Sequence, residues 1–154
     1  MPKKRRLSIR PDYDAFMISI SCQKKDYWVA FTLNEHLNLS LRRIPDLPVP
    51  LAVEGENSLF QTFYCENADT LLAYFLVSNR GTAGRLFPAL RNIDFFLMIN
   101  GPLLIENRGK MVESVKQIPG ILLAHPVELS SLKDSDLFLS SLELHLLESG
   151  RAGK

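Results

Sequence analysis

The chain contains little cysteine and histidine, and neither residue type occurs at the spacing of a metal site. Its two cysteines are Cys22 and Cys65, and its three histidines are His36, His125 and His145. Neither a Cys-x-x-Cys pair nor a His-x-x-x-His pair is present, and zinc sites use such short spacings. Two distant thiols also form no disulfide framework. We therefore expect reduced, buried cysteines, a cytoplasmic protein, and no metal or cofactor.

Long apolar runs are absent as well. No window approaches the roughly 18 consecutive apolar residues that a transmembrane helix needs. Asp12 and Asp14 interrupt the chain where the apolar part of a secretory signal would lie. The sequence therefore predicts neither a membrane span nor a signal peptide.

Recognisable catalytic sets are also lacking. Nucleophilic catalysis needs a nucleophile, a base and an orienting group, and the chain has no Gly-x-Ser-x-Gly elbow. Cys22 follows a strand-like run and could lie at a helix N-terminus, but we interpret it as a small buried residue. The carboxylate pairs Asp12/Asp14 and Glu54/Glu56 fall in a turn and in a polar loop, where nothing buries them for acid–base work. We expect that the protein is not an enzyme.

The composition is that of a globular protein. Hydrophobic residues make up 46% and charged residues 23% of the chain, and 154 residues fit one domain. The net charge is +1, so no overall field attracts nucleic acid. We predict a single domain over residues 1–154, with residues 1–6 as a basic tail or sheet edge. Residues 130–154 would form a C-terminal segment, either a helix or a strand, that is frayed at its end.

Hydrophobic periodicity predicts the strands and helices. Apolar or alternating runs predict strands over residues 5–10, 15–21, 39–43, 58–65, 70–78, 92–100 and 121–129. Helical spacing predicts helices over residues 23–37, 104–117 and 134–148, although the leucines of the last segment also alternate. Because hairpins join most strands, we expect an α+β fold. It would be a mainly antiparallel sheet of five to seven strands with two or three helices packed on one face.

Four details of this fold follow from particular residues. Ser21 would cap the helix over residues 23–37, and Asn38 would end it. Residues 92–100, 104–117 and 121–127 would form a right-handed crossover if their two strands are parallel neighbours. The aromatic residues on one face of the first helix are expected in the core, and they are Tyr27, Trp28 and Phe31. Residues 44–57 would be a loop or a sheet edge because of three prolines, Pro45, Pro48 and Pro50.

Two groups of residues are candidate binding sites. Asn79, Arg80 and Arg85 stand in a loop with two glycines, whose backbone and guanidinium groups could hold a phosphate or carboxylate. Loop flexibility alone is the alternative. The second group consists of basic residues that could contact a nucleic-acid backbone. A charged edge strand that discourages aggregation would explain the same basic residues equally well. Its members are Lys3, Lys4, Arg5, Arg6, Arg42 and Arg43.

A lone aspartate precedes one of the most apolar runs in the chain. Pro88 restricts Phe87 to extended geometry, and Asp94 stands just before the apolar run that starts at Phe95. An aspartate at such a place can bond the backbone of a preceding turn. We interpret Phe87, Pro88, Asp94 and Phe95 as a structural motif that anchors a loop to a buried strand.

Several segments resemble the IPExxxDY family of small bacterial proteins. They are AFMISISCQKKDYWVAFTLNEHLNL, AYFLVSNRG, LFPALRNIDFFLMI and VESVKQIPGIL, in family order within residues 7–127. Phe87-Pro88-Ala89 stands where the family has Ile-Pro-Glu, and Asp94-Phe95 stands where it has Asp-Tyr, with four residues between instead of three. The resemblance implies a single-domain cytoplasmic protein without an assigned activity. Because Ala89 replaces the glutamate, it also implies a structural use of the motif in this chain.

The absence of a catalytic set makes a binding role the first hypothesis. We expect a non-enzymatic domain that binds a protein partner or a second copy of itself. The apolar C-terminal segment LFLSSLELHLL favours this hypothesis, since a monomer would have to cover it. RNA or ribosome association through the basic residues is the second hypothesis. A small anionic ligand at residues 79–85 is the third.

Overall fold

The computed structural model describes residues 15–50 and 57–152, with side chains described as far as residue 148. The strand expected over residues 5–10, the turn after it and the basic residues Lys3, Lys4, Arg5 and Arg6 lie outside the described residues. The same holds for both carboxylate pairs.

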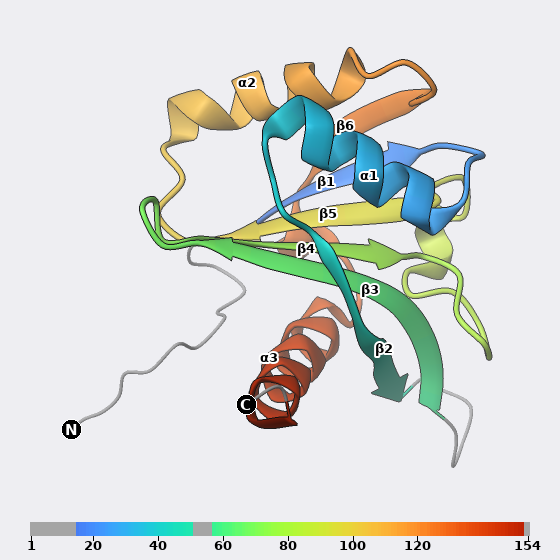
Figure 1. Ribbon diagram of the computed structural model, residues 1–154. Coiled ribbons are helices and arrows are strands. Elements are labelled where there is room, and N and C mark those ends of the chain that lie inside the picture. The colour runs from blue at the N-terminus through green and yellow to red at the C-terminus, as the bar shows by residue number, and fades with distance from the viewer. Residues whose placement is uncertain (1–14, 51–56, 153–154) are drawn as a thin grey trace.

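Within the described residues, one six-stranded sheet forms in which all neighbouring strands are antiparallel (Figure 1). The strand order is β2-β3-β4-β5-β1-β6. The strands are β1 (Ala15–Ser21), β2 (Arg42–Pro50), β3 (Asn57–Asn67), β4 (Leu72–Ser78), β5 (Phe95–Asn100) and β6 (Leu123–Val127). The helices are α1 (Asp26–Leu37), α2 (Ile105–Lys116) and α3 (Ser135–Ala152), with short 3-10 turns at Pro88–Leu90 and Leu129–Ser131. The predicted α+β fold with an antiparallel sheet is confirmed.

The central strands carry apolar side chains on both faces of the sheet. In β5, Phe95, Leu97 and Ile99 belong to one buried cluster, and Phe96 and Met98 belong to another. The two sets separate because successive side chains of a strand point to opposite faces. A sheet with two apolar faces must be covered on both of them.

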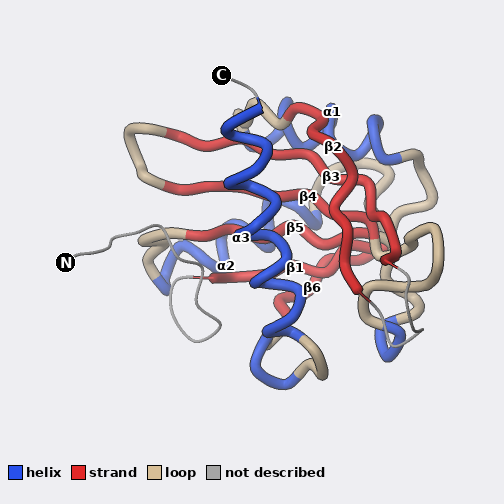
Figure 2. The backbone as a smooth tube through the Cα atoms, turned by 90° about the horizontal axis from the view of Figure 1, so that it is seen from below, coloured by secondary structure: helices blue, strands red, loops and turns tan. Residues whose placement is uncertain are grey.

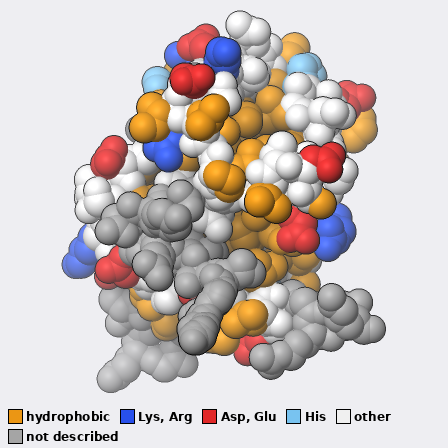
Figure 3. All heavy atoms as spheres, turned by 90° about the vertical axis from the view of Figure 1, so that its left-hand side faces the viewer, with side chains coloured by type: hydrophobic (Ala, Val, Ile, Leu, Met, Phe, Trp, Pro, Cys, Tyr) orange, Lys and Arg blue, Asp and Glu red, His pale blue; other side chains and the backbone are white. Residues whose placement is uncertain are grey.

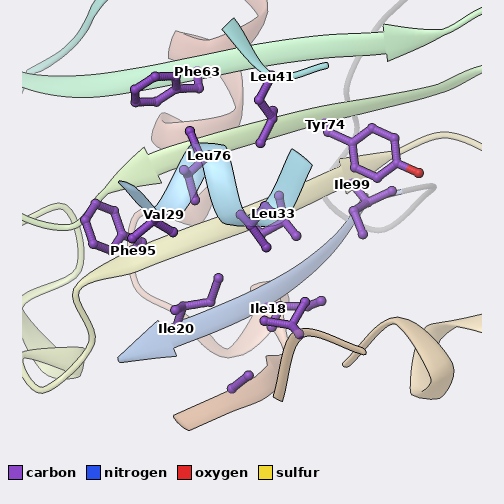
Figure 4. Close-up of a cluster of buried hydrophobic side chains, with 14 of the residues drawn as sticks. Ile18, Ile20, Val29, Leu33, Leu41, Phe63, Tyr74, Leu76, Phe95 and Ile99 are labelled. Carbon is purple, nitrogen blue, oxygen red and sulfur yellow. The ribbon is translucent and has the colours of Figure 1, made fainter. Parts of the chain in front are cut away.

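Helices therefore lie on both faces of the sheet. α1 and α2 cover one face, and α3 crosses the other (Figures 1 and 2). Val29 and Leu33 of α1 share a cluster with Leu76 of β4 (Figure 4). Phe138 and Leu142 of α3 belong to the cluster on the opposite face. The expectation that the helices pack on one face is wrong, since the apolar central strands leave no face for solvent.

β1 lies between β5 and β6. Ile18 of β1 pairs with Leu97 on one side and with Pro126 on the other. β5 and β6 thus run in the same direction without being neighbours, so the condition for a crossover between parallel neighbours is not met. Periodicity locates strands, but it does not say which distant segment lies between them.

Prolines occupy both edge strands of the sheet. β2 contains Pro45, Pro48 and Pro50, and its register with β3 shifts between Ile44 and Leu47. β6, at the other edge, contains Pro126. Because proline has no N–H to donate, it suits a strand with one free side. The prediction of a sheet edge for this proline-rich segment is confirmed where the structure describes it.

The ends of α1 differ in how well they were predicted. Lys25 occupies the N-cap position without a side-chain hydrogen bond. Ser21 instead donates its hydroxyl to the carbonyl of Asn92 over 3.0 Å, so the Ser21 cap is wrong. Asn38 adopts a left-handed φ of 58° and donates its N–H to Asn34, which ends the helix as predicted.

The C-terminal segment is a helix and not a strand, and it covers its own sheet. Phe138, Leu139, Leu142 and His145 are buried along one side of α3, which is helical spacing and not alternation. Nε2 of His145 donates to the carbonyl of Pro45 over 2.6 Å and ties α3 to β2. The segment LFLSSLELHLL therefore packs on its own chain.

Candidate functional site

Asn79 organises the loop between β4 and β5 from inside the protein. Its side chain is fully buried and donates to the carbonyls of Leu90 and Ile93, each over 3.0 Å. Its side-chain oxygen accepts from the N–H of Phe87 over 2.9 Å. All polar atoms of this side chain have partners, so Asn79 has nothing to offer to a ligand.

The two arginines of the candidate anion site lie in a small hairpin on the start of β3. Arg80 and Arg85 pair across this hairpin, and the N–H of Ala83 donates to Oγ of Ser58 over 2.9 Å. Arg80 is exposed. Arg85 is half-buried, and its Nη1 atom is buried without a hydrogen-bond partner among the described residues. The structure brings these two arginines together but turns Asn79 away from them.

Asp94 joins β5 to the end of β1. Its carboxylate accepts from the N–H of Cys22 over 2.9 Å, and its own N–H donates to the carbonyl of Ile20 over 2.9 Å. The sequence predicts a hydrogen bond from Asp94 to the backbone of a preceding turn. The carboxylate instead bonds the backbone of Cys22, which directly follows β1. Cys22 is buried, and a buried N–H needs an acceptor, which explains why the carboxylate of Asp94 bonds there.

The remaining residues of that motif are packed in the core. The ring of Phe87 meets those of Phe96 and Phe138 edge-on, with centroids 5.4 and 5.5 Å apart. Phe95 is buried on the opposite face of the sheet, and Pro88 begins the short 3-10 turn. The motif therefore links β5, α3 and β1.

Burial disfavours the thiolate form of both cysteines. Cys22 and Cys65 are buried and free, and burial raises the pKa of each. The thiol of Cys22 donates to the carbonyl of Gly120 over 3.3 Å. A reactive cysteine needs a lowered pKa and access to solvent. Both thiols lack both properties.

Arg42 and Arg43 are engaged within the protein. The guanidinium of Arg42 lies over the ring of Tyr64 at 5.8 Å. Arg43 pairs with Asp46 at 2.7 Å and with Asp26 at 3.5 Å. Arg42 pairs with Tyr64 on β3, whereas the hairpin of Arg80 and Arg85 packs at Ser58, about 20 Å away along the strand. The structure does not gather these four arginines into one basic surface.

The described residues contain no group of three or more His, Cys, Asp or Glu side chains close enough to hold a metal ion. A shallow hollow lies where α3 begins, lined by Ser130, Leu132 and residues 134–137. It contains none of the candidate residues from the sequence.

Two aromatic residues on α1 are exposed, against the expectation of a core position. Tyr27 is 65% and Phe31 is 59% exposed, while Trp28 packs inward against Gly120. We call the surface formed by Lys24, Tyr27, Phe31 and Glu35 the outer face of α1. The signal for it is the composition of α1, whose apolar residues are spread over two opposite sides of the helix and so do not reveal which side meets the sheet.

Other exposed apolar side chains are aliphatic and spread over several elements. Leu71 stands in the β3–β4 turn and Leu104 and Ile105 at the start of α2. Figure 3 views the molecule from the side of the β3–β4 turn and the start of α2, and it shows apolar side chains interspersed with charged ones there. Leu144 and Leu147 are exposed on α3. The two largest exposed apolar side chains, those of Tyr27 and Phe31, therefore lie together on one helix, on the outer face of α1.

In residues 15–50 and 57–152, no helix has the length and apolar character to cross a membrane. Comparison with known proteins gives no relative: no family model, no curated protein and no solved structure matches this chain. The resemblance to the IPExxxDY family thus stays a prediction, and the candidate site rests on the geometry of the chain itself.

Proposed function

We propose that this chain is a non-enzymatic interaction domain that binds a protein through the outer face of α1. The observation that carries this proposal is the exposure of Tyr27 and Phe31, at 65% and 59%. They stand four positions apart and so lie next to each other on the helix. Aromatic side chains are enriched at protein interfaces and supply a large share of the binding energy there.

α1 is apolar on two opposite sides. Val29 and Leu33 are fully buried against the sheet, and Tyr27 and Phe31 point away from it. A helix that is apolar on two opposite sides can pack against a neighbour on each of them. A second surface placed against α1 would cover Tyr27 and Phe31 as the sheet covers Val29 and Leu33.

The outer face is presented on a firmly held helix. The side chain of Asn34 accepts from the N–H of Leu41 over 2.8 Å and donates to the carbonyl of Leu41 over 3.1 Å. Asp26, at the start of α1, pairs with Arg43 of β2 at 3.5 Å. Because the start of α1 pairs with β2 and Asn34 near its end bonds Leu41 just before β2, a partner would bind without first ordering the helix.

The sheet edges offer a poorer route to a partner. Added strands bind through backbone N–H and C=O groups of an edge strand. Three prolines in β2 and one in β6 remove donors from both edges. This favours binding through a helix face.

The test compares two double variants in affinity capture from the native cell, with quantitative mass spectrometry. Tyr27→Ala/Phe31→Ala removes the outer aromatic pair, and Leu144→Ala/Leu147→Ala removes two exposed leucines of α3. We expect the first variant to lose the captured proteins more than tenfold, since interface aromatics contribute about 2 kcal/mol or more each. The second should capture them as the wild type does. Equal recovery by all three proteins would contradict the proposal.

A further inference from the structure

We infer that the occupant of the outer face of α1 is a second copy of the same chain, with the two α1 helices packed antiparallel about a two-fold axis. This inference rests on the proposed function, because it uses the same surface. It comes from the order of residues along that surface. A cation stands before α1, the aromatic pair lies in its first half, and an anion stands near its end.

The two charges lie along one rim of the aromatic pair. Lys24 and Glu35 are both exposed. Nζ of Lys24 lies 5.5 Å from the centroid of the Trp28 ring, so this charge is on the Trp28 side of the helix. Glu35 follows Trp28 by seven positions, which is nearly two full turns, and it therefore lies on the same side.

An antiparallel pair brings these charges together. With the two-fold axis between Tyr27 and Phe31, Tyr27 of each copy faces Phe31 of the other. Lys24, which precedes the N-cap Lys25, then lies near positions 34 and 35 of the other copy. Because the two-fold axis is perpendicular to both helices, the rim with Lys24 and Glu35 lies on the same side of the interface in both copies. Each Lys24 is thus within side-chain reach of the other Glu35.

The same pattern does not favour a parallel pair. In a parallel pair the two-fold axis runs along the helices and places the charged rims of the two copies on opposite sides of the interface, so Lys24 and Glu35 of different copies do not meet. An antiparallel two-fold pair forms the attractive contact twice, because the surface is complementary to itself. The order of charges along α1 therefore selects one arrangement.

The experiment is sedimentation and light scattering of the full chain over a range of concentrations, with charge reversals at the two rim positions. The wild type should reach twice its 17.5 kDa mass. Tyr27→Ala/Phe31→Ala should be monomeric, and Leu144→Ala/Leu147→Ala should dimerise as the wild type does. Lys24→Glu and Glu35→Lys should each weaken dimerisation by about tenfold, since two attractive pairs become repulsive.

Two combinations restore the attraction. The double variant Lys24→Glu/Glu35→Lys should dimerise within about threefold of the wild type. An equimolar mixture of the two single variants should form a mixed dimer, because every rim contact in it joins opposite charges. Far-UV circular dichroism and thermal midpoints establish that each variant is folded.

Three results would overturn the inference: a wild type that stays monomeric at every concentration, a dimer that survives loss of the aromatic pair, or charge reversals that leave dimerisation unchanged. A monomeric wild type that still captures another protein through Tyr27 and Phe31 would overturn only the self-pairing. Loss of any dependence on Tyr27 and Phe31 in both experiments would overturn the proposed function as well.

Discussion

The carboxylate of Asp94 accepts a hydrogen bond from the backbone N–H of Cys22, a residue 72 positions earlier in the chain. The bond closes the corner where β1 ends and β5 begins. The N–H of Asp94 donates back to the carbonyl of Ile20, so the corner is held from both sides. Because Cys22 is buried, water cannot replace the carboxylate as the acceptor for its N–H.

Asp94→Ala should lower the free energy of unfolding by about 1–3 kcal/mol, the cost of a buried donor left without an acceptor. Asp94→Asn keeps an acceptor oxygen at the same place and should cost less. Urea denaturation measures both. Asp69→Ala, at an exposed turn, is the control and should stay within about 0.5 kcal/mol of the wild type. A change at Asp94 no larger than at Asp69 would show that the bond is unimportant.

Asn79→Asp keeps the shape of the side chain and removes its two donors. The carbonyls of Leu90 and Ile93 would then face an acceptor, and we expect a loss of about 2–5 kcal/mol. Asn67→Asp is the matched control, because the side chain of Asn67 only accepts, from the N–H groups of Asp69 and Thr70. Thermal or urea unfolding of the two variants should differ clearly. Similar values would contradict the role given to the donors.

Two glycines should respond to alanine in opposite ways. A Cβ at Gly81 would lie 2.2 Å from Oγ of Ser58 and 2.6 Å from the ring of Phe60, so Gly81→Ala should destabilise the protein by about 1–3 kcal/mol. A Cβ at Gly109, inside α2, would meet nothing within 4 Å. Gly109→Ala should therefore stabilise it by about 0.5–1 kcal/mol. Melting temperatures that moved in the same direction would contradict this assignment.

Alkaline pH should destabilise the fold. Burial raises the pKa of the thiols of Cys22 and Cys65 and of the phenols of Tyr64 and Tyr74 above their ordinary values of 9.0 and 10.0. The folded state therefore keeps these protons at a pH where the unfolded state has lost them. The free energy of unfolding should be constant below pH 9.0 on their account and fall as the pH rises beyond it.

Tyr74→Phe separates this effect from general alkaline damage. It removes one buried phenol, so the loss of stability above pH 10.0 should be smaller than in the wild type. Denaturant titrations at neutral and alkaline pH provide the comparison. An identical pH dependence in both proteins would exclude Tyr74 as a source.

Local patterns predicted the elements of this fold better than their arrangement. The apolar runs located β1, β4 and β5, and the prolines placed β2 at an edge, because both signals act within a few residues. The insertion of β1 between β5 and β6 depends on pairing between segments far apart. No local pattern carries that information.

The candidate site was missed for a related reason. Tyr27 and Phe31 have helical spacing, which is also the spacing of a core face. Since Val29 and Leu33 on the other side of α1 are equally apolar, only the structure distinguishes the two sides. Asn79 was misread as a ligand group because its three partners belong to backbone that folds around it.

The position of α3 in the chain has a consequence for synthesis. All six strands of the described residues precede α3, so the helix that covers Phe60, Phe96 and Met98 is the last described element to be translated. At roughly 5–20 residues per second, the 18 residues of α3 take about one to four seconds to add. Until α3 has been added and has docked, the face of the sheet that carries these three side chains lacks its cover, so the docking of α3 completes this half of the core.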